Sequence, residues 1–258
     1  MKVVILAGGY GTRLGEETDI RPKPMVEIGG KPILWHIMKI YSTQGFKDFI
    51  ICLGYKGEVI RNYFASLYLN SSDVTFNIKE GQFRVFSNTS PDWKVTLVDT
   101  GLDTLTGGRL LKIKGLIKED TFMMTYGDGL ADIDMNKLLS FHQKHGKLAT
   151  VTAVRPPPRF GAMKIESSGK VESFEEKADG VESWINGGFF VLNQSVFNYI
   201  GEDEPYFEGY PLSNLAKDGQ LFAYRHYGFW RPMDSMSDKR ILEEMWKRKE
   251  APWKIWKD

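Results

Sequence analysis

A short apolar run at the start of the chain ends in a cluster of glycines and is followed by two cations. Residues 3–7 read V-V-I-L-A, which predicts a buried strand, and residues 8–11 contain three glycines. Glycines at this point let the backbone turn sharply and bring its N–H groups close to a ligand. Arg13 and Lys23 place two positive charges on the same loop system, and two prolines stiffen the backbone around Lys23. The stretch therefore predicts a cradle for the phosphates of a nucleotide.

The loop differs from two common phosphate-binding motifs. The dinucleotide pattern G-x-G-x-x-G fails because Leu14 stands where the third glycine belongs, and the P-loop pattern G-x-x-x-x-G-K-[ST] is absent. Residues 8–13 instead read G-G-Y-G-T-R, and P-K-P follows at 22–24. A Gly-rich hairpin turn that carries surface cations is the simplest alternative to a nucleotide site.

Two aspartates far apart in the sequence are candidate metal ligands. Asp128 stands between two glycines after the apolar run at 122–125, and Asp234 ends the stretch G-F-W-R-P-M-D at 228–234. In open α/β sheets the ligand crevice lies outside the carboxyl ends of the strands, where Asp128 is expected. Two carboxylates, together with phosphate oxygens and water, are the hard ligands that Mg²⁺ prefers. The residues alone also allow a turn aspartate at 128 and a helix N-cap at 234.

Residues 3–34 resemble the signature of the sugar-1-phosphate nucleotidylyltransferases, L-A-G-G-x-G-T-R-L followed by P-K-P and K-P. Further matching stretches make the resemblance nearly end to end; they lie at 106–110, 126–129, 186–190 and 228–234. One departure is local, because the family often has proline shortly after R-L, where this chain has G-E-E at 15–17.

The resemblance implies a reaction in which a nucleoside triphosphate and a sugar 1-phosphate give a nucleotide sugar and pyrophosphate. The expected substrates are CTP and α-D-glucose 1-phosphate, and the product would serve CDP-linked deoxysugar synthesis for O-antigen and lipopolysaccharide. Catalysis would then require alignment and charge neutralisation at the α-phosphorus, because the sugar phosphate is already an anionic nucleophile.

Roles for individual residues follow from the same resemblance. The expected catalytic residues are Arg13, Lys23 and Asp128, and the expected Mg²⁺ ligands are Asp128 and Asp234. The expected nucleotide-binding residues are Leu6, Ala7, Gly8, Gly9, Tyr10, Gly11, Thr12, Arg13, Lys23, Thr104, Gly108, Arg109 and Asp128. The expected sugar-phosphate-binding residues are Phe160, Gly161, Glu176, Lys177, Asn186 and Gly188. The family usually has proline after E-K, where this chain has Ala178, and a surface ion pair is the alternative for Glu176 and Lys177.

The elements that must hold these residues alternate between strand and helix in the first part of the chain. We expect helices from Lys31-Pro32 to Gly45 and at 58–69, 134–145, 210–217 and 236–247, strands at 47–53, 95–98, 122–125, 148–154 and 188–192, and hairpins at 73–88 and 160–176. The β-α-β-α order favours parallel strands with helices packed outside them. The predicted fold is one α/β domain over 1–258, with a Rossmann-like mixed, mostly parallel sheet flanked by helices. Its nucleotide-binding half is expected at 1–130 and its β-rich sugar-phosphate-binding half at 131–258.

Composition limits the classes of partner. The 258 residues carry a formal net charge of +1, so no global field draws the chain to nucleic acid or to an anionic membrane. The one cysteine, Cys52, lies in an apolar run; it excludes a disulfide or a zinc site within one chain and fits a reducing cytoplasm. Residues 1–7 are too short an apolar run for a signal peptide or a membrane span.

The sequence also leads to expectations on oligomeric state and to three alternative functions. The resemblance implies a homo-oligomer, specifically a hexamer. The apolar side chains of the 73–88 hairpin need a partner surface, which we expect to be another subunit.

Three alternative functions remain open. The first is a thymidylyl- or uridylyltransferase acting on glucose 1-phosphate, and the second is a non-catalytic nucleotide-sugar sensor. A glycosyltransferase would need an Asp-x-Asp metal motif, for which Asp132 and Asp134 are the candidates; Asp134 is better interpreted as a helix N-cap.

Overall fold

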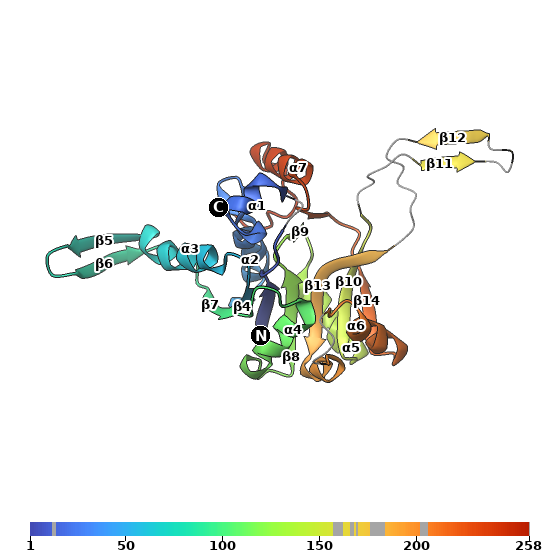
Figure 1. The fold of residues 1–258 in the computed structure, drawn as a ribbon, viewed down its shortest axis with the longest axis horizontal. Helices are drawn as coiled ribbons and strands as arrows, with labels where there is room; N and C mark the ends of the chain where they lie inside the picture. Colours follow the sequence, from blue (N-terminus) through green and yellow to red (C-terminus); the bar gives the residue numbers. More distant parts are fainter. Residues whose placement is uncertain are drawn as a thin grey trace.

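A single seven-stranded sheet forms the centre of the molecule (Figure 1). The computed structural model describes residues 1–11, 14–156, 162–165, 168, 170–175, 184–201 and 206–257. The strands are ordered β14-β10-β13-β8-β1-β4-β7. Their bounds are β1 Lys2–Leu6, β4 Asp48–Leu53, β7 Lys94–Asp99, β8 Thr121–Tyr126, β10 Ala149–Val154, β13 Ile185–Asn193 and β14 Leu221–Arg225.

The sheet is mixed but mostly parallel. Strand β1 lies between β8 and β4, parallel to both, and β4 continues to β7 in the same direction. Strand β13 runs antiparallel to its neighbours β8 and β10, and β14 returns to a parallel pairing with β10. The predicted α/β fold with a mixed, mostly parallel sheet is therefore confirmed.

Side chains of the first strand alternate between two separate apolar layers. Val3 and Ile5 belong to the layer that includes α2, α3, α5 and α7, whereas Val4 and Leu6 belong to the layer that includes α4 and α6. This alternation is the period of two that a strand imposes when both of its faces are covered. The bounds of the helices are α1 Glu16–Ile20, α2 Ile33–Thr43, α3 Gly57–Asn70, α4 Thr106–Ile113, α5 Met135–His145, α6 Tyr210–Lys217 and α7 Met236–Lys247, with short 3₁₀ segments at Lys23–Met25, Lys114–Leu116 and Gln194–Tyr199.

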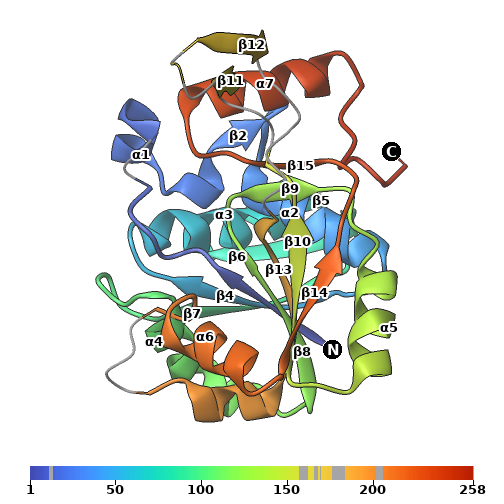
Figure 2. The ribbon, with the colours of Figure 1, turned by 90° about the vertical axis from the view of Figure 1, so that its right-hand side faces the viewer.

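In the part of the chain that the structure describes, four two-stranded pairs lie outside the central sheet. They are β2 Glu27–Ile28 with β3 Lys31–Pro32, β5 Ser72–Asn77 with β6 Gln82–Asn88, β9 Gly129–Ala131 with β15 Trp230–Pro232, and β11 Ala162–Ile165 with β12 Val171–Glu175. The β5–β6 and β11–β12 hairpins project from opposite sides of the molecule (Figure 1), so both predicted hairpins are present. In Figure 2, α7 lies near the top of the molecule, the β9–β15 pair lies below it next to the central strands, and α4 and α6 lie at the bottom.

The structure differs from the expected elements at two places near the site. Lys31 and Pro32 pair with Glu27 and Ile28 as a short strand, so α2 begins at Ile33 with Pro32 as its N-cap residue. The β9–β15 pair was not expected; it joins the segment after Asp128 to the segment before Asp234. No helix in the described ranges is long and apolar enough to cross a membrane.

Candidate active site

The larger of two adjoining pockets lies where β1 and β8 end. It has a volume of about 400 Å³, and the described residues that line it are Leu6, Ala7, Gly8, Gly9, Gly11, Lys23, Pro24, Thr104, Leu105, Thr106, Arg109, Tyr126, Gly127, Asp128 and Asp234. Much of this lining is the glycine loop after β1 and the start of α4. Gly11 has a φ of +67°, and a Cβ there would lie 2.9 Å from the Cβ of Lys23, so only glycine fits this turn without strain.

Arg109 braces the loops around this pocket. Its buried guanidinium donates to the carbonyl oxygens of Gly8 at 2.9 Å, Leu53 at 2.9 Å and Gly101 at 2.8 Å. These carbonyls follow or end β1, β4 and β7, so one side chain from α4 fixes the carboxyl-terminal ends of three neighbouring strands. Burial lowers the pKa of Arg109, and the many carbonyl acceptors compensate the charge in place of a carboxylate partner.

The smaller pocket is lined by residues of later strands and of the segments that adjoin them. Its volume is about 220 Å³, and its described lining comprises Thr125, Tyr126, Asp128, Gly129, Asn186, Gly187, Gly188, Trp230, Pro232 and Asp234. Trp230 Nε1 donates to the carbonyl oxygen of Gly187 at 2.7 Å, which ties β15 to β13 across the pocket. Tyr126, Asp128 and Asp234 line both pockets, so the two pockets meet at these residues.

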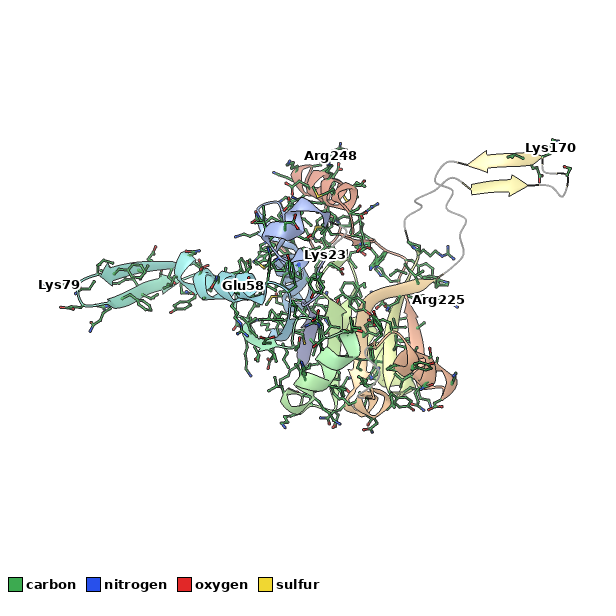
Figure 3. All side chains as sticks on the ribbon, in the orientation of Figure 1. Lys23, Glu58, Lys79, Lys170, Arg225 and Arg248 are labelled. Atoms are coloured by element: carbon green, nitrogen blue, oxygen red, sulfur yellow. The ribbon has the colours of Figure 1, made fainter. Side chains whose placement is uncertain are left out.

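Lys23 lies at this meeting point, near the centre of the molecule (Figure 3). Its Nζ donates to Asp128 Oδ2 at 2.7 Å and to Asp234 Oδ1 at 2.6 Å, and its side chain is 13% exposed. Burial lowers the pKa of Lys23, but the two carboxylates outweigh burial and raise the pKa above its ordinary value. Lys23 is therefore a fixed positive charge between the two pockets.

The donor set at this point fits a hard divalent cation that is shared with a substrate. One carboxylate oxygen of Asp128 and one of Asp234 both contact the ammonium group of Lys23, so these two oxygens already bind one positive centre. Within the described residues, no group of three or more His, Cys, Asp or Glu side chains could hold a metal ion. A cation bound by Asp128 and Asp234 would thus take its other ligands from phosphate oxygens and water, which is common for Mg²⁺.

The structure brings most of the predicted residues that it describes to these pockets. All of the described nucleotide-binding candidates line the larger pocket except Tyr10 and Gly108, and Asn186 and Gly188 line the smaller one. Tyr10 instead donates its hydroxyl to Asp103 at 2.6 Å. The predicted residues that lie outside the described part of the chain are Thr12, Arg13, Phe160, Gly161, Glu176 and Lys177.

Two alternative interpretations of the aspartates do not hold. Ser235, not Asp234, caps α7, in a capping box with Asp238. Asp134 accepts from the Lys137 N–H and caps α5, as expected, while Asp132 Oδ1 lies 2.9 Å from His226 Nε2. The Asp-x-Asp pair is therefore divided between a helix cap and a histidine contact, which argues against a glycosyltransferase metal motif.

Several residues of the site were not predicted. Tyr126 and Trp230 stand in stretches that match the family, but neither the glycine spacing nor the carboxylates singled them out. Glu208 accepts hydrogen bonds from the hydroxyls of Tyr126 and Thr106, and no motif around it signals this role. Only the fold brings residue 208 to residues 106 and 126.

Comparisons with known proteins agree with this geometry. Residues 2–216 match the nucleotidyl transferase family. The chain is 56% identical over 257 residues to glucose-1-phosphate cytidylyltransferases of Salmonella typhi and Salmonella typhimurium, in alignments that span 99% of this chain and 100% of each relative. The crystal structure of HddC from Yersinia pseudotuberculosis superposes with a TM-score of 0.69 at 24% identity, covering 95% of this chain and 99% of HddC, which supports the fold. The chain belongs to the nucleotidyl transferase family.

Proposed function

We propose that this chain transfers the cytidylyl group of CTP to α-D-glucose 1-phosphate, giving CDP-glucose and pyrophosphate. The proposal is supported by 56% identity over nearly the whole chain to relatives that carry this activity in their names. CDP-glucose would then enter the synthesis of CDP-linked deoxysugars for O-antigen and lipopolysaccharide. The cytoplasmic location expected from the sequence remains a prediction.

One observation carries the assignment of substrates to pockets. Two pockets meet at Tyr126, Asp128 and Asp234, with the ammonium group of Lys23 held between the two aspartates. The larger pocket, which the glycine loop lines, is the size and type of site that a nucleoside triphosphate needs, and the smaller, side-chain-lined pocket suits a sugar phosphate. The division into a nucleotide half at 1–130 and a sugar-phosphate half at 131–258 is part of this proposal.

The reaction mainly requires that the sugar phosphate and the α-phosphorus of CTP are aligned. A phosphate oxygen of the sugar phosphate attacks the α-phosphorus of CTP; a new P–O bond forms as the bond to the β-phosphate bridging oxygen breaks, and pyrophosphate leaves. Both reactants are polyanions, so the main barrier that the protein can lower is their mutual repulsion. Lys23 would neutralise charge at the α-phosphate, and Arg13 and Thr12 would contact the β- and γ-phosphates.

Mg²⁺ is the expected cofactor, with Asp128 and Asp234 as its protein ligands. When bound, the ion would supply charge neutralisation and orientation of the phosphates. Lys23 and Arg109 provide the protein's own contribution: Lys23 adds positive charge, and Arg109 binds the Gly8 carbonyl oxygen of the glycine loop, so that this oxygen does not face the phosphates.

The β5–β6 hairpin is the proposed contact between copies of this chain. Its exposed apolar side chains include Phe76, Ile78, Phe83 and Phe86, which are 51%, 86%, 56% and 63% exposed. Two strands alone bury little, so a second copy that covers these rings would stabilise the hairpin. Replacing residues 73–88 by a short Gly-Ser turn should lower the mass found by light scattering. An unchanged mass with loss of activity would contradict an interface role.

Product identification tests the proposed function. Incubation with CTP, glucose 1-phosphate and Mg²⁺ should produce CDP-glucose and pyrophosphate in equal amounts, as followed by ³¹P NMR. Chelation by EDTA should stop the reaction, and Mg²⁺ should restore it. Hydrolysis of CTP without a sugar nucleotide, or binding of CDP-glucose without turnover, would contradict the proposal and favour a nucleotide-sugar sensor.

A further inference from the structure

A chain of hydrogen bonds runs from the smaller pocket to the larger one through Tyr126. At the smaller pocket, the Gly188 N–H donates to Asn186 Oδ1 at 2.8 Å, and Asn186 Nδ2 donates to the Tyr126 hydroxyl at 3.2 Å. The Tyr126 hydroxyl donates to Glu208, whose other carboxylate oxygen accepts from the hydroxyl of Thr106. Thr106 lines the larger pocket. Glu208, a surface residue outside both described linings, therefore joins the two pockets.

The carboxylate at the centre fixes the direction of every bond in this chain. A carboxylate only accepts hydrogen bonds, so the hydroxyls of Tyr126 and Thr106 must both point their hydrogens at Glu208. The Tyr126 oxygen can then act only as the acceptor for Asn186, while the Gly188 N–H occupies Asn186 Oδ1. This leaves the second N–H of Asn186 Nδ2 as the group that the side chain offers to a ligand in the smaller pocket.

Tyr126 depends on Glu208 more than Thr106 does. The oxygen of Thr106 also accepts the N–H of Phe207 at 2.9 Å, and Thr106 is the first residue of α4, so two anchors remain if Glu208 is lost. The hydrogen of the Tyr126 hydroxyl has Glu208 as its acceptor. Loss of the carboxylate would therefore disturb the sugar side more than the nucleotide side.

We propose that Glu208 is a positioning residue for the sugar 1-phosphate: through the Tyr126 hydroxyl it orients the amide of Asn186 so that one N–H faces an acceptor oxygen of that substrate. The proposal rests on the proposed function, because it takes the smaller pocket as the sugar-phosphate site. Glu208 acts only through Tyr126 and Asn186 and needs no contact with either substrate.

Steady-state kinetics of E208Q, Y126F and the double variant test this role. In E208Q, an amide donor replaces one of the two acceptor oxygens, so one hydroxyl must reverse. The KM for glucose 1-phosphate should rise about 10-fold in E208Q and in Y126F, and the double variant should show no further rise, because both changes break the same chain. The KM for the nucleotide and the melting temperature should stay close to those of the wild type.

A surface pair elsewhere supplies the matched control. Tyr199 donates its hydroxyl to Asp218 at 2.9 Å, away from both pockets, so D218A removes a similar tyrosine–carboxylate bond without affecting either KM. An unchanged KM for glucose 1-phosphate in E208Q, an equal rise for both substrates, or additive effects in the double variant would each overturn the proposal.

The test of Glu208 can be distinguished from the test of the proposed function. The wild type is first assayed with CTP, UTP, dTTP and ATP, and the variants are compared with the nucleotide that it uses. If that nucleotide is not CTP, the proposed function fails while the test of Glu208 continues. If no nucleotide supports turnover, calorimetric titration with glucose 1-phosphate compares the same variants, and equal affinities overturn the role of Glu208.

Discussion

The two pockets of this chain are lined by different parts of the chain. The larger one is lined in part by the backbone of the glycine loop after β1, and Arg109 binds the Gly8 carbonyl oxygen of that loop. The smaller one is lined by residues of four strands that lie far apart in the chain, β8, β9, β13 and β15, and the hydrogen bond from Trp230 to the Gly187 carbonyl joins two of these strands across it. A backbone cradle depends on glycines and on the braces behind them, whereas a side-chain pocket depends on hydrogen bonds between distant segments. Mutations should therefore act differently in the two pockets and most strongly at Lys23, which is bonded to the two aspartates that line both.

The largest effect is expected at the meeting point. In K23A, the positive charge that lies between Asp128 and Asp234 is lost, and two partly buried carboxylates then face the phosphates without it. We expect kcat to fall on the order of 100-fold or more, because this charge matters most in the transition state. Pyrophosphate release under saturating substrates measures the change.

Lys94 provides a control for that experiment. It pairs with Asp48 at 3.3 Å at the surface, and K94A should leave kcat near the wild-type value. If K23A changed only the KM of one substrate and left kcat unchanged, Lys23 would act in that pocket alone. This result would contradict its position between the two pockets.

A smaller effect is expected from a change in the brace of the larger pocket. A Cβ at Gly8 would lie 2.2 Å from Nη1 of Arg109, so G8A must displace the buried guanidinium and release the loop carbonyls. We expect kcat/KM for the nucleotide to fall about 10- to 100-fold, together with a lower melting temperature. Gly115 has nothing within 4 Å of an added Cβ, so G115A is the matched control. Equal losses for nucleotide and sugar phosphate would show that the two pockets are not separable.

The smallest effect is expected in the side-chain pocket. W230F replaces the indole by a smaller aromatic ring that has no donor for the Gly187 carbonyl. The KM for glucose 1-phosphate should rise about 3- to 10-fold, the effect of one neutral hydrogen bond, with little change for the nucleotide. Trp93 packs against Phe49 and Trp35 outside the pockets, so W93F should leave both KM values unchanged. A rise in the nucleotide KM of W230F would argue that the substrates are assigned to the wrong pockets.

The difference between the pockets also explains which features could be predicted from the sequence and which could not. The glycine loop, Lys23 and Asp128 were predictable because their spacing is local and the chemistry of phosphate recognition is carried by few residues. Most central strands were predictable as short continuous apolar runs and most helices from apolar residues at a spacing of 3.6, whereas strand β14 and the short helix α1 were not predicted. The β9–β15 pair, the Trp230 bond to Gly187 and the role of Glu208 were not, because each depends on segments that lie far apart in the chain.

Arg109 shows a limit of a different kind. The resemblance predicts a nucleotide contact, and Arg109 does line the larger pocket, but its guanidinium bonds to backbone carbonyls of three loops. No spacing rule signals such a brace, because its acceptors are backbone atoms that every residue possesses. Contact of Arg109 with the nucleotide remains a prediction.

Nucleotide preference tests the central claim most directly. Cytosine presents an amine donor where uracil and thymine present a carbonyl acceptor, and each buried polar group left unpaired by the wrong base costs roughly 1–3 kcal/mol. The kcat/KM for pyrophosphate release is to be measured for CTP, UTP, dTTP and ATP at fixed glucose 1-phosphate and Mg²⁺. We predict a preference for CTP of about tenfold or more, which one or two such contacts can provide. A higher kcat/KM for UTP or dTTP would contradict the account and identify a uridylyl- or thymidylyltransferase on the same fold.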